Sequence, residues 1–376
     1  MTTSLAITGW GVLSPQGVGA DAFARAMAQG RSGLADVGGM FDEPLPAQKA
    51  HAIVDFDVRE HLGRRRTGNL DRSTAFAVTA TGLALADAGL VLAEEDREEV
   101  GVVLGCTAGS LRATADFDRE TLVNDRPYMV EPLLFPNAVM NCAASRCAIW
   151  HDLRGVNGTV PSGQLSAVSV LRYGRTLIRR GHARTLLLGA VEEFGTHRAW
   201  IEQHRYGGEP SRLPLGEAAV VLVAEDAARV RAEGRPMDAE ILAAEFGQYA
   251  APGQSPDPAE GLAGRLRDAL RAAGVTPAEV TSVVTGERGI PHLDEVERSA
   301  VEAVFGRHGE RLRVKELTGE CDGAAGMVQI AAVLARHRED PARDGQVSVV
   351  TSCSEDGAVG AVVFRGWSRN GAGRDD

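Results

Sequence analysis

The chain has 376 residues, of which 44% are hydrophobic and 24% charged, so it can bury a sizeable core as one large fold or as two domain-sized units. Its formal net charge of −11 argues against a nucleic-acid partner, because such proteins present basic faces. No apolar run approaches the ~20 residues that span a bilayer, and residues 1–20 lack the basic start and unbroken apolar stretch of a signal peptide. We therefore expect a cytoplasmic protein with no membrane contact.

Short apolar segments alternate with helical segments along the whole chain, which predicts a layered α/β fold. In the first half the pattern predicts, in chain order, a strand over 5–9, a helix over 21–29 capped by Asp21, a helix over 74–88, and strands over 100–104, 184–190 and 218–224. A charged helical stretch over 225–234 follows, and it separates this half from the next.

The second half repeats the same order of elements. It predicts strands over 239–246, 280–285, 312–316, 347–352 and 358–364, and helices over 262–273, 293–305 and 324–336. We therefore expect two similar halves, 1–228 and 229–376, which pack as one unit with a site at their junction.

The cysteines and histidines show no spacing that is typical of a metal site. The five cysteines are odd in number, scattered and without a C-x-x-C pair, so we expect buried free thiols rather than disulfides. The nine histidines include no H-E-x-x-H or comparable pair. We expect neither a metal nor another cofactor.

Gln164 stands where a fold of this kind would carry a nucleophile. A run of small residues over 155–163 leads into a helix with apolar residues at helical spacing. A cysteine at such a helix start has a lowered pKa, because the amides and the helix dipole favour the thiolate. A carboxamide cannot ionise and is no nucleophile. Taken alone, a Gln at a helix start is most often an ordinary surface residue, so the rest of the chain has to decide.

Motifs along nearly the whole chain resemble those of the β-ketoacyl synthases. They are I-T-G-W-G-V-L-S-P-Q-G at 7–17, L-D-R at 70–72, L-A-D-A-G-L at 85–90, L-F-P-N at 134–137, G-A-V-E-E at 189–193, G-E-A-A at 216–219 and G-A-A-G at 323–326. They occur in the family's order and at its spacing. The resemblance implies the thiolase fold, in which two similar α/β halves build a five-layered αβαβα architecture.

The resemblance also implies that the catalytic positions have been lost. An active ketosynthase uses a cysteine thiolate to accept the acyl chain and two histidines to bind and decarboxylate the malonyl group. By the resemblance, Gln164 stands at the cysteine position, and Gly286 and Glu320 stand at the two histidine positions, whereas the family's lysine is kept as Lys315. His292 lies a turn from the first position, and we do not expect it to substitute. Condensation by this chain alone is therefore not expected.

Two kinds of relative carry Gln in place of the cysteine. The decarboxylating ketosynthase of polyketide loading modules keeps both histidines, whereas the chain-length factor, the β subunit of type II polyketide ketosynthases, typically lacks them. Gly286 and Glu320 therefore favour the chain-length factor, which implies a heterodimer with an active ketosynthase α subunit and contact with an acyl carrier protein through that complex. The short length and divergence of the chain favour a polyene system. A malonyl-carrier-protein decarboxylase is the alternative.

In such a dimer, interface residues of one subunit help to line the acyl tunnel of the other, so side-chain volume would set tunnel depth. The candidates for that lining are Leu111, Ala115, Phe117, Phe135 and Met140. Ordinary core packing is the competing interpretation for each of them.

We expect the Gln164 side chain to fill the vestigial pocket at the nucleophile position, with its amide bound to backbone donors. A third hypothesis is a hydrolase or acyltransferase that uses Ser162, Ser166 or Cys321. The position of Ser166, two residues past Gln164, predicts a side chain that points away from the pocket. No base stands beside Cys321 in the sequence, which ranks this hypothesis lowest.

Overall fold

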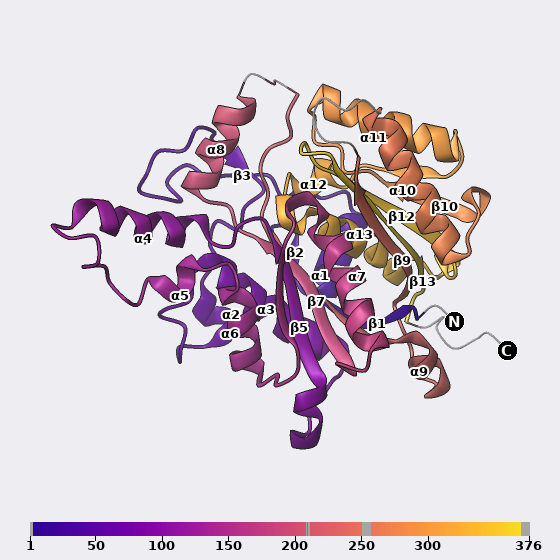
Figure 1. Ribbon diagram of the computed structural model, residues 1–376, viewed down its shortest axis with the longest axis horizontal. Coiled ribbons are helices and arrows are strands. Elements are labelled where there is room, and N and C mark those ends of the chain that lie inside the picture. Colours follow the sequence, from indigo (N-terminus) through magenta and orange to yellow (C-terminus); the bar gives the residue numbers. More distant parts are fainter. Residues whose placement is uncertain (1–2, 208, 210, 250–256, 370–376) are drawn as a thin grey trace.

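The computed structural model describes residues 3–207, 209, 211–249 and 257–369 (Figure 1). Eleven strands of this part form one mixed sheet, in the order β11-β10-β12-β13-β9-β1-β8-β7-β5-β6, with β2 paired to β1. Their bounds are β1 Leu5–Ser14, β2 Gly17–Val18, β5 Val100–Cys106, β6 Asn157–Pro161, β7 Thr185–Glu192, β8 Ala218–Asp226, β9 Ala239–Gln248, β10 Val280–Val284, β11 Glu310–Leu312, β12 Val347–Cys353 and β13 Ala358–Gly366. Two further strands, β3 Ala35–Asp36 and β4 Lys49–Ala50, form a small hairpin.

The sheet consists of two halves with the same topology. In the first half, β1 pairs antiparallel with β8, β8 antiparallel with β7, and β7, β5 and β6 run parallel. In the second half, β9, β13, β12, β10 and β11 repeat this pattern strand for strand. The halves join where β1 and β9 pair over three residues. The boundary at 228 and 229 stays a prediction, because both halves share this sheet.

Helices separate and cover the two half-sheets. The longer ones are α1 Ala20–Ala28, α3 Arg72–Asp87, α4 Leu111–Val123, α6 Cys142–His151, α7 Ser166–Arg179, α8 Thr196–Tyr206, α10 Pro258–Ala273, α11 Pro291–Phe305 and α13 Ala325–Glu339. The shorter ones are α2 Val58–Leu62, α5 Phe135–Ala138, α9 Ala227–Ala232 and α12 Lys315–Thr318. α3 and α6 pack on the outer face of the first half-sheet, and α10 and α11 on that of the second, whereas α7 and α13 lie between the half-sheets (Figure 1).

Alternating side chains in the strands build these layers. In β7, Leu186 and Leu188 belong to the central core around α7 and α13, whereas Leu187 belongs to the core under α3 and α6. In β12, Val350 faces the central core and Val349 the core under α10 and α11. Continuous apolar runs therefore cover both faces of each half-sheet. The predicted five-layered thiolase fold is confirmed.

Several predicted elements were too short; the strand expected over 5–9 runs to Ser14, and the helix expected over 262–273 begins at Pro258. Three further expectations at element ends were wrong. α1 follows Gly19 with no side-chain cap, and Asp21 lies in its first turn. The helix expected over 225–234 is only α9, because Asp226 ends β8 and caps α9 by accepting from the Arg229 amide. The strand expected over 312–316 ends at Leu312, and Lys315 opens α12 instead.

One segment projects from the body of the fold. Residues 111–140, which include α4 and α5 and are called the arm below, extend to the left in Figure 1. α4 buries a single residue, Ala113, and α5 buries none. The arm thus has little attachment to the core. No helix in the described part of the chain is long and apolar enough to cross a membrane.

Candidate functional site

The three positions that sequence comparison marked as altered meet around one lysine. Lys315 Nζ donates to Glu320 Oε2 at 2.8 Å, to the Gly286 carbonyl at 2.8 Å and to Gln164 Oε1 at 3.3 Å. Gln164 stands in the short turn Gly163–Leu165 before α7, and both Lys315 and Glu320 are buried. Gln164, Gly286 and Glu320 therefore lie together, with Lys315 at their centre.

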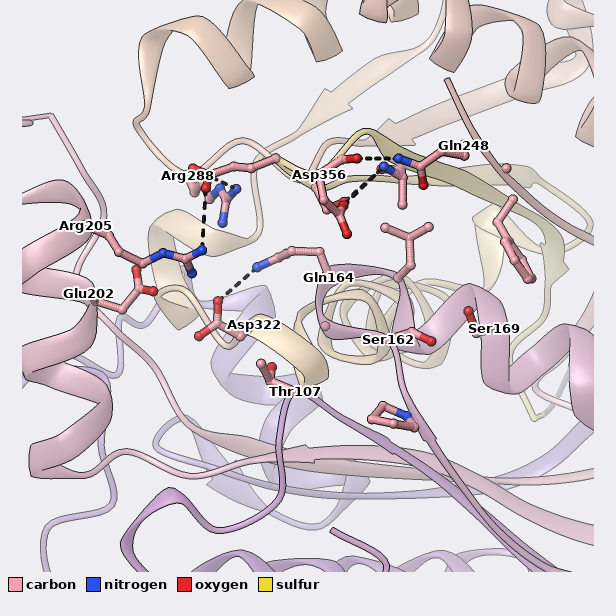
Figure 2. Close-up of a pocket in the computed structure, with 18 of the residues that line it drawn as sticks. Thr107, Ser162, Gln164, Ser169, Glu202, Arg205, Gln248, Arg288, Asp322 and Asp356 are labelled. Atoms are coloured by element: carbon pink, nitrogen blue, oxygen red, sulfur yellow. Dashed lines mark hydrogen bonds and ion pairs between the residues drawn. The ribbon is translucent and has the colours of Figure 1, made fainter. Parts of the chain in front are cut away.

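The Gln164 amide binds side chains and not backbone donors. Its Nε2 donates to Glu320 Oε1 and to Asp322 Oδ1, each at 3.1 Å. Figure 2 shows the bond to Asp322. The prediction that the amide binds backbone donors was wrong, because all of its observed hydrogen bonds are to two carboxylates and the lysine. Gln164 thus ties the start of α7, in the first half, to the segment before α13 in the second.

Arg198 and Asp322 complete this network, and sequence analysis missed both. Asp322 takes a left-handed conformation with φ 38°. The buried Arg198 on α8 binds its carboxylate, with Nη2 to Oδ2 at 2.6 Å. Arg198 also donates to the carbonyls of Glu193, Gly216 and Glu320. The only sequence signal was the acidic pair at 320 and 322, and nothing local linked it to an arginine over 120 residues away.

The electrostatics of the network keep Glu320 ionised. Burial favours the neutral acid, but the charges of Lys315 and Arg288 and the hydrogen bonds from Lys315 and Gln164 outweigh it and lower the pKa of Glu320 to about 2. An ionised carboxylate accepts hydrogen bonds and cannot donate one. It would repel the negative charge that develops on an enolate, the opposite of what a catalytic histidine does there.

An open cavity of about 580 Å³ adjoins Gln164 (Figure 2). Its polar lining includes Thr107, Ser162, Ser169, Glu202, Arg205, Tyr206, Gln248, Arg288, Asp322, Ser354, Glu355 and Asp356. No cysteine or histidine of the described residues lines it. At its edge Glu355, in the turn between β12 and β13, accepts from the Tyr206 hydroxyl and lies 4.0 Å from the guanidinium groups of Arg205 and Arg288. The described lining of this cleft thus holds neither a thiol nor an imidazole.

Of the three remaining nucleophile candidates, Ser162, Ser166 and Cys321, one lines the cavity, and no described histidine lines it beside that candidate. Ser162 lines the cavity, but Ser166 is fully buried and donates to the Cys106 carbonyl, away from the cavity as predicted. Burial raises the pKa of the Cys321 thiol, which lies outside the cavity lining. His292 is exposed at the start of α11 and does not reach the cavity, so it cannot replace the missing imidazole.

The five tunnel candidates lie on or beside the arm, and none lines this cavity. None belongs to the buried core either, which argues against the competing interpretation of core packing. The rings of Phe117 and Phe135 contact each other at 5.7 Å between centroids, and Phe135 and Met140 are 55% and 46% exposed. Leu111 and Ala115 are partly buried on α4. Whether these side chains line a tunnel stays a prediction.

Comparison with known proteins places the chain in a family. A model of the β-ketoacyl synthase N-terminal domain matches residues 2–234, and one of the C-terminal domain matches residues 239–340. The chain belongs to the β-ketoacyl synthase family. Within this family it is 31% identical to the "Actinorhodin polyketide putative beta-ketoacyl synthase 2" of Streptomyces coelicolor, over 89% of this chain and 86% of that protein.

Other β-ketoacyl synthases resemble it over a similar length. The 3-oxoacyl-[acyl-carrier-protein] synthase 2 of Coxiella burnetii is 27% identical over 88% of this chain and 84% of that protein. Among solved structures, "The ishigamide ketosynthase/chain length factor" matches with a TM-score of 0.84 and 33% identity, covering 97% of this chain and 100% of that one. The relatives thus include proteins named as synthases and one named as a ketosynthase/chain length factor.

Proposed function

We propose that this protein is a non-catalytic chain-length-factor subunit, which pairs with an active ketosynthase and shapes the acyl tunnel that controls the chain length of a polyketide, in particular a polyene. One observation carries the proposal. The ammonium group of Lys315 binds Gln164 and Glu320, which stand at the family's cysteine and second histidine positions, in a closed set of hydrogen bonds. These contacts hold the site together and leave it no group that could accept an acyl chain.

The exposed surface of the arm supports pairing with another subunit. Large apolar side chains gather there at high exposure, and isolated monomers rarely leave so many together uncovered. They are Leu122 (83%), Tyr128 (72%), Leu133 (65%), Val123 (62%), Met129 (59%), Phe135 (55%) and Met140 (46%). Such a surface fits a partner that buries it, and aromatic residues and methionines are enriched at such interfaces.

The sheet also has an open edge that supports pairing. β6 pairs only with β5 on one side, and its other side has no strand partner among the described residues. Its residues are partly or fully exposed. An uncovered edge strand presents unpaired backbone donors and acceptors, which natural proteins normally pair or protect. A subunit of the same fold could cover this edge and the arm together.

The arm is where a partner's tunnel would be shaped. Phe117 and Phe135 form an aromatic pair that a bound partner would enclose, together with the neighbouring Leu111, Ala115 and Met140. Since none of these residues supports the core, their volumes can change without loss of the fold. This freedom is what a subunit needs if its role is to set the length of a product.

A malonyl-carrier-protein decarboxylase is the second candidate, because Gln164 borders an open cavity of about 580 Å³ that could admit a thioester. That enzyme would have to act without an imidazole, since none of the described histidines lines the cavity. Release of carbon dioxide from malonyl-carrier protein by the purified chain would support it. No release above the uncatalysed rate would leave the chain-length factor as the function.

Co-expression with an active ketosynthase that carries the family's cysteine and both histidines, followed by native mass measurement of the purified complex, tests the main proposal. A one-to-one complex is expected, and Leu133→Asp is expected to weaken it by placing a charge in the interface. Val91→Asp is the matched control, because Val91 is 89% exposed outside the arm and should tolerate the same change. A stable homodimer that does not bind the ketosynthase, or equal loss of binding in both variants, would contradict the proposal.

A further inference from the structure

Two arginines line one wall of the cavity beside Gln164, and neither takes part in the hydrogen bonds around Lys315 (Figure 2). Arg205 lies near the end of α8, in the first half of the fold, and Arg288 lies between β10 and α11, in the second half. The guanidinium carbon of each lies 5.9 Å from the centre of the Tyr206 ring. The two cations therefore face the cavity from the same side.

Neither guanidinium group donates a hydrogen bond to any of the described residues. Of these residues, only the Glu355 carboxylate lies within ion-pair distance, 4.0 Å from each group, and it already accepts from the Tyr206 hydroxyl. Arg288 is only 8% exposed, and buried polar groups are normally hydrogen-bonded. Two cations thus share one distant carboxylate, and the donors of a nearly buried arginine face an open cavity.

The other acids of the cavity lining do not supply the missing acceptor. Asp322 binds Arg198 at 2.6 Å, and Glu202 lies 3.6 Å from Arg212, so each of these acids has a cation of its own. The Asp356 carboxylate accepts from two groups of its own turn. The pair of arginines on the wall therefore carries a positive charge that a second anion, bound from solution, would balance.

The opposite part of the lining suits an apolar chain. The cavity has a volume of about 580 Å³, which lies within the ~300–1,000 Å³ of small-molecule sites. Pro161, Leu165, Phe246 and Ala358 contribute apolar surface to it, and Phe246 is 38% exposed. A cationic wall together with an apolar wall fits a ligand that has an anionic end and a hydrocarbon chain.

We propose that this cavity binds a free carboxylic acid with an apolar chain, whose carboxylate lies between Arg205 and Arg288. A guanidinium group presents parallel N–H donors that match the two oxygens of a carboxylate. The bound acid joins α8 in the first half to the segment before α11 in the second, and it stabilises the folded protein by mass action. The site requires no reaction and no partner subunit, so it does not rest on the proposed function.

Isothermal titration calorimetry of the full-length protein with sodium hexanoate tests the site. Saturable one-to-one binding is expected. Arg205→Gln and Arg288→Gln should each weaken it about tenfold or more, because each removes charge-assisted hydrogen bonds to the carboxylate. Arg307→Gln is the matched control, since Arg307 is exposed and does not line this cavity, and its dissociation constant should equal that of the unaltered protein.

Related ligands test the two ends of the site separately. Hexanamide has nearly the same shape without the charge and should bind at least about tenfold more weakly than hexanoate. Acetate should also bind more weakly, because it has no chain to bury against the apolar wall. Hexyl phosphate that binds more tightly than hexanoate would overturn the assignment to carboxylic acids.

Two results would overturn the site itself. One is the absence of saturable hexanoate binding to the unaltered protein. The other is equal affinity of the unaltered protein and Arg205→Gln, whose altered side chain is 60% exposed, so that this comparison holds even if Arg288→Gln fails to fold. Because the titration contains no ketosynthase, its outcome is independent of the proposed partner.

Discussion

Lys315 Nζ lies 2.8 Å from Glu320 Oε2, and both side chains are almost completely buried. By the resemblance, Glu320 stands at a histidine position of active ketosynthases, whereas the family's lysine is kept. In this structure Glu320 is the counter-ion of that lysine. Gln164 bridges the pair to Asp322, so this cluster joins the two halves of the fold through polar contacts.

Lys315→Met is expected to lower the free energy of unfolding by about 3–5 kcal/mol, because it leaves the Glu320 carboxylate buried without its cation. The double variant Lys315→Met with Glu320→Leu should recover most of this loss, since it removes both charges and fills the space with apolar atoms. Urea denaturation of the single and double variants measures the difference. Equal stability of the single variant and the unaltered protein would show that the pair does not hold the site.

Gln164→Cys should not restore a reactive thiolate. The start of α7 favours ionisation, but a thiol at this position would face the carboxylates that the Gln164 amide now binds, those of Glu320 and Asp322. Nearby negative charges raise a thiol pKa by roughly 1–3 units, which outweighs a single helix terminus. Alkylation by iodoacetamide at pH 7.5, followed by mass spectrometry of the 164 peptide, measures the reactivity.

The comparison variant for that experiment is Gln164→Cys combined with Glu320→Gln. It removes one of the two facing charges and should react about tenfold faster than the single variant. If both cysteines react at the rate of an exposed free thiol, the electrostatic account of the site is incorrect. Neither variant is expected to condense acyl chains, because no imidazole is restored.

Phe117→Ala is expected to change the product of the complex with the ketosynthase. It removes a ring that contacts Phe135 at 5.7 Å between centroids, and it enlarges any tunnel that the arm encloses. The chain length of the product, read by mass spectrometry, should increase while the complex still forms. Arg119→Ala, an exposed change on the same helix, should leave the product as it was. An unchanged product from the Phe117 variant would show that this ring does not line the tunnel.

His51 should make the protein less stable in mild acid. It is buried behind the site, with Gly319 against its ring, and burial lowers its pKa to about 4. The unfolded chain takes up a proton at this imidazole near pH 6.5, whereas the folded chain does not until about pH 4. The stability from His51 is therefore present above pH 6.5 and lost as pH falls to about 4.

The matched variants isolate this contribution. Relative to the unaltered protein, His51→Gln should lose less stability between pH 7 and pH 4, by roughly 1–3 kcal/mol. His182→Gln is the control, because His182 is exposed and should leave the pH profile unchanged. Urea denaturation at pH 7, 5.5 and 4 measures the three profiles. Parallel profiles for all three proteins would mean that His51 is protonated in the folded state.

Most of the fold could be read from the sequence, because strands such as 184–190 and 347–352 are continuous apolar runs bounded by turn residues. The repeated order of elements also predicted the two halves. The errors fell at element ends. Asp226 is the N-cap of α9 and is not part of that helix. Lys315 binds Glu320 and does not belong to the strand that was expected over 312–316. Such ends are decided by tertiary contacts that no local pattern contains.

The sequence by itself determined which residue types stand at positions 164, 286 and 320: a carboxamide, a glycine and a carboxylate, none of which is a thiolate or an imidazole. Only the tertiary structure decided what these residues do instead. Lys315 and Asp322 bind Gln164 from segments up to 158 positions away, and Arg198 in turn binds Asp322. The contacts before the arm were likewise decided in three dimensions, because Ser110 there binds Glu193, which follows a different strand. The type of a residue is given by its own position in the sequence, whereas its burial and the charges around it depend on how the whole fold packs.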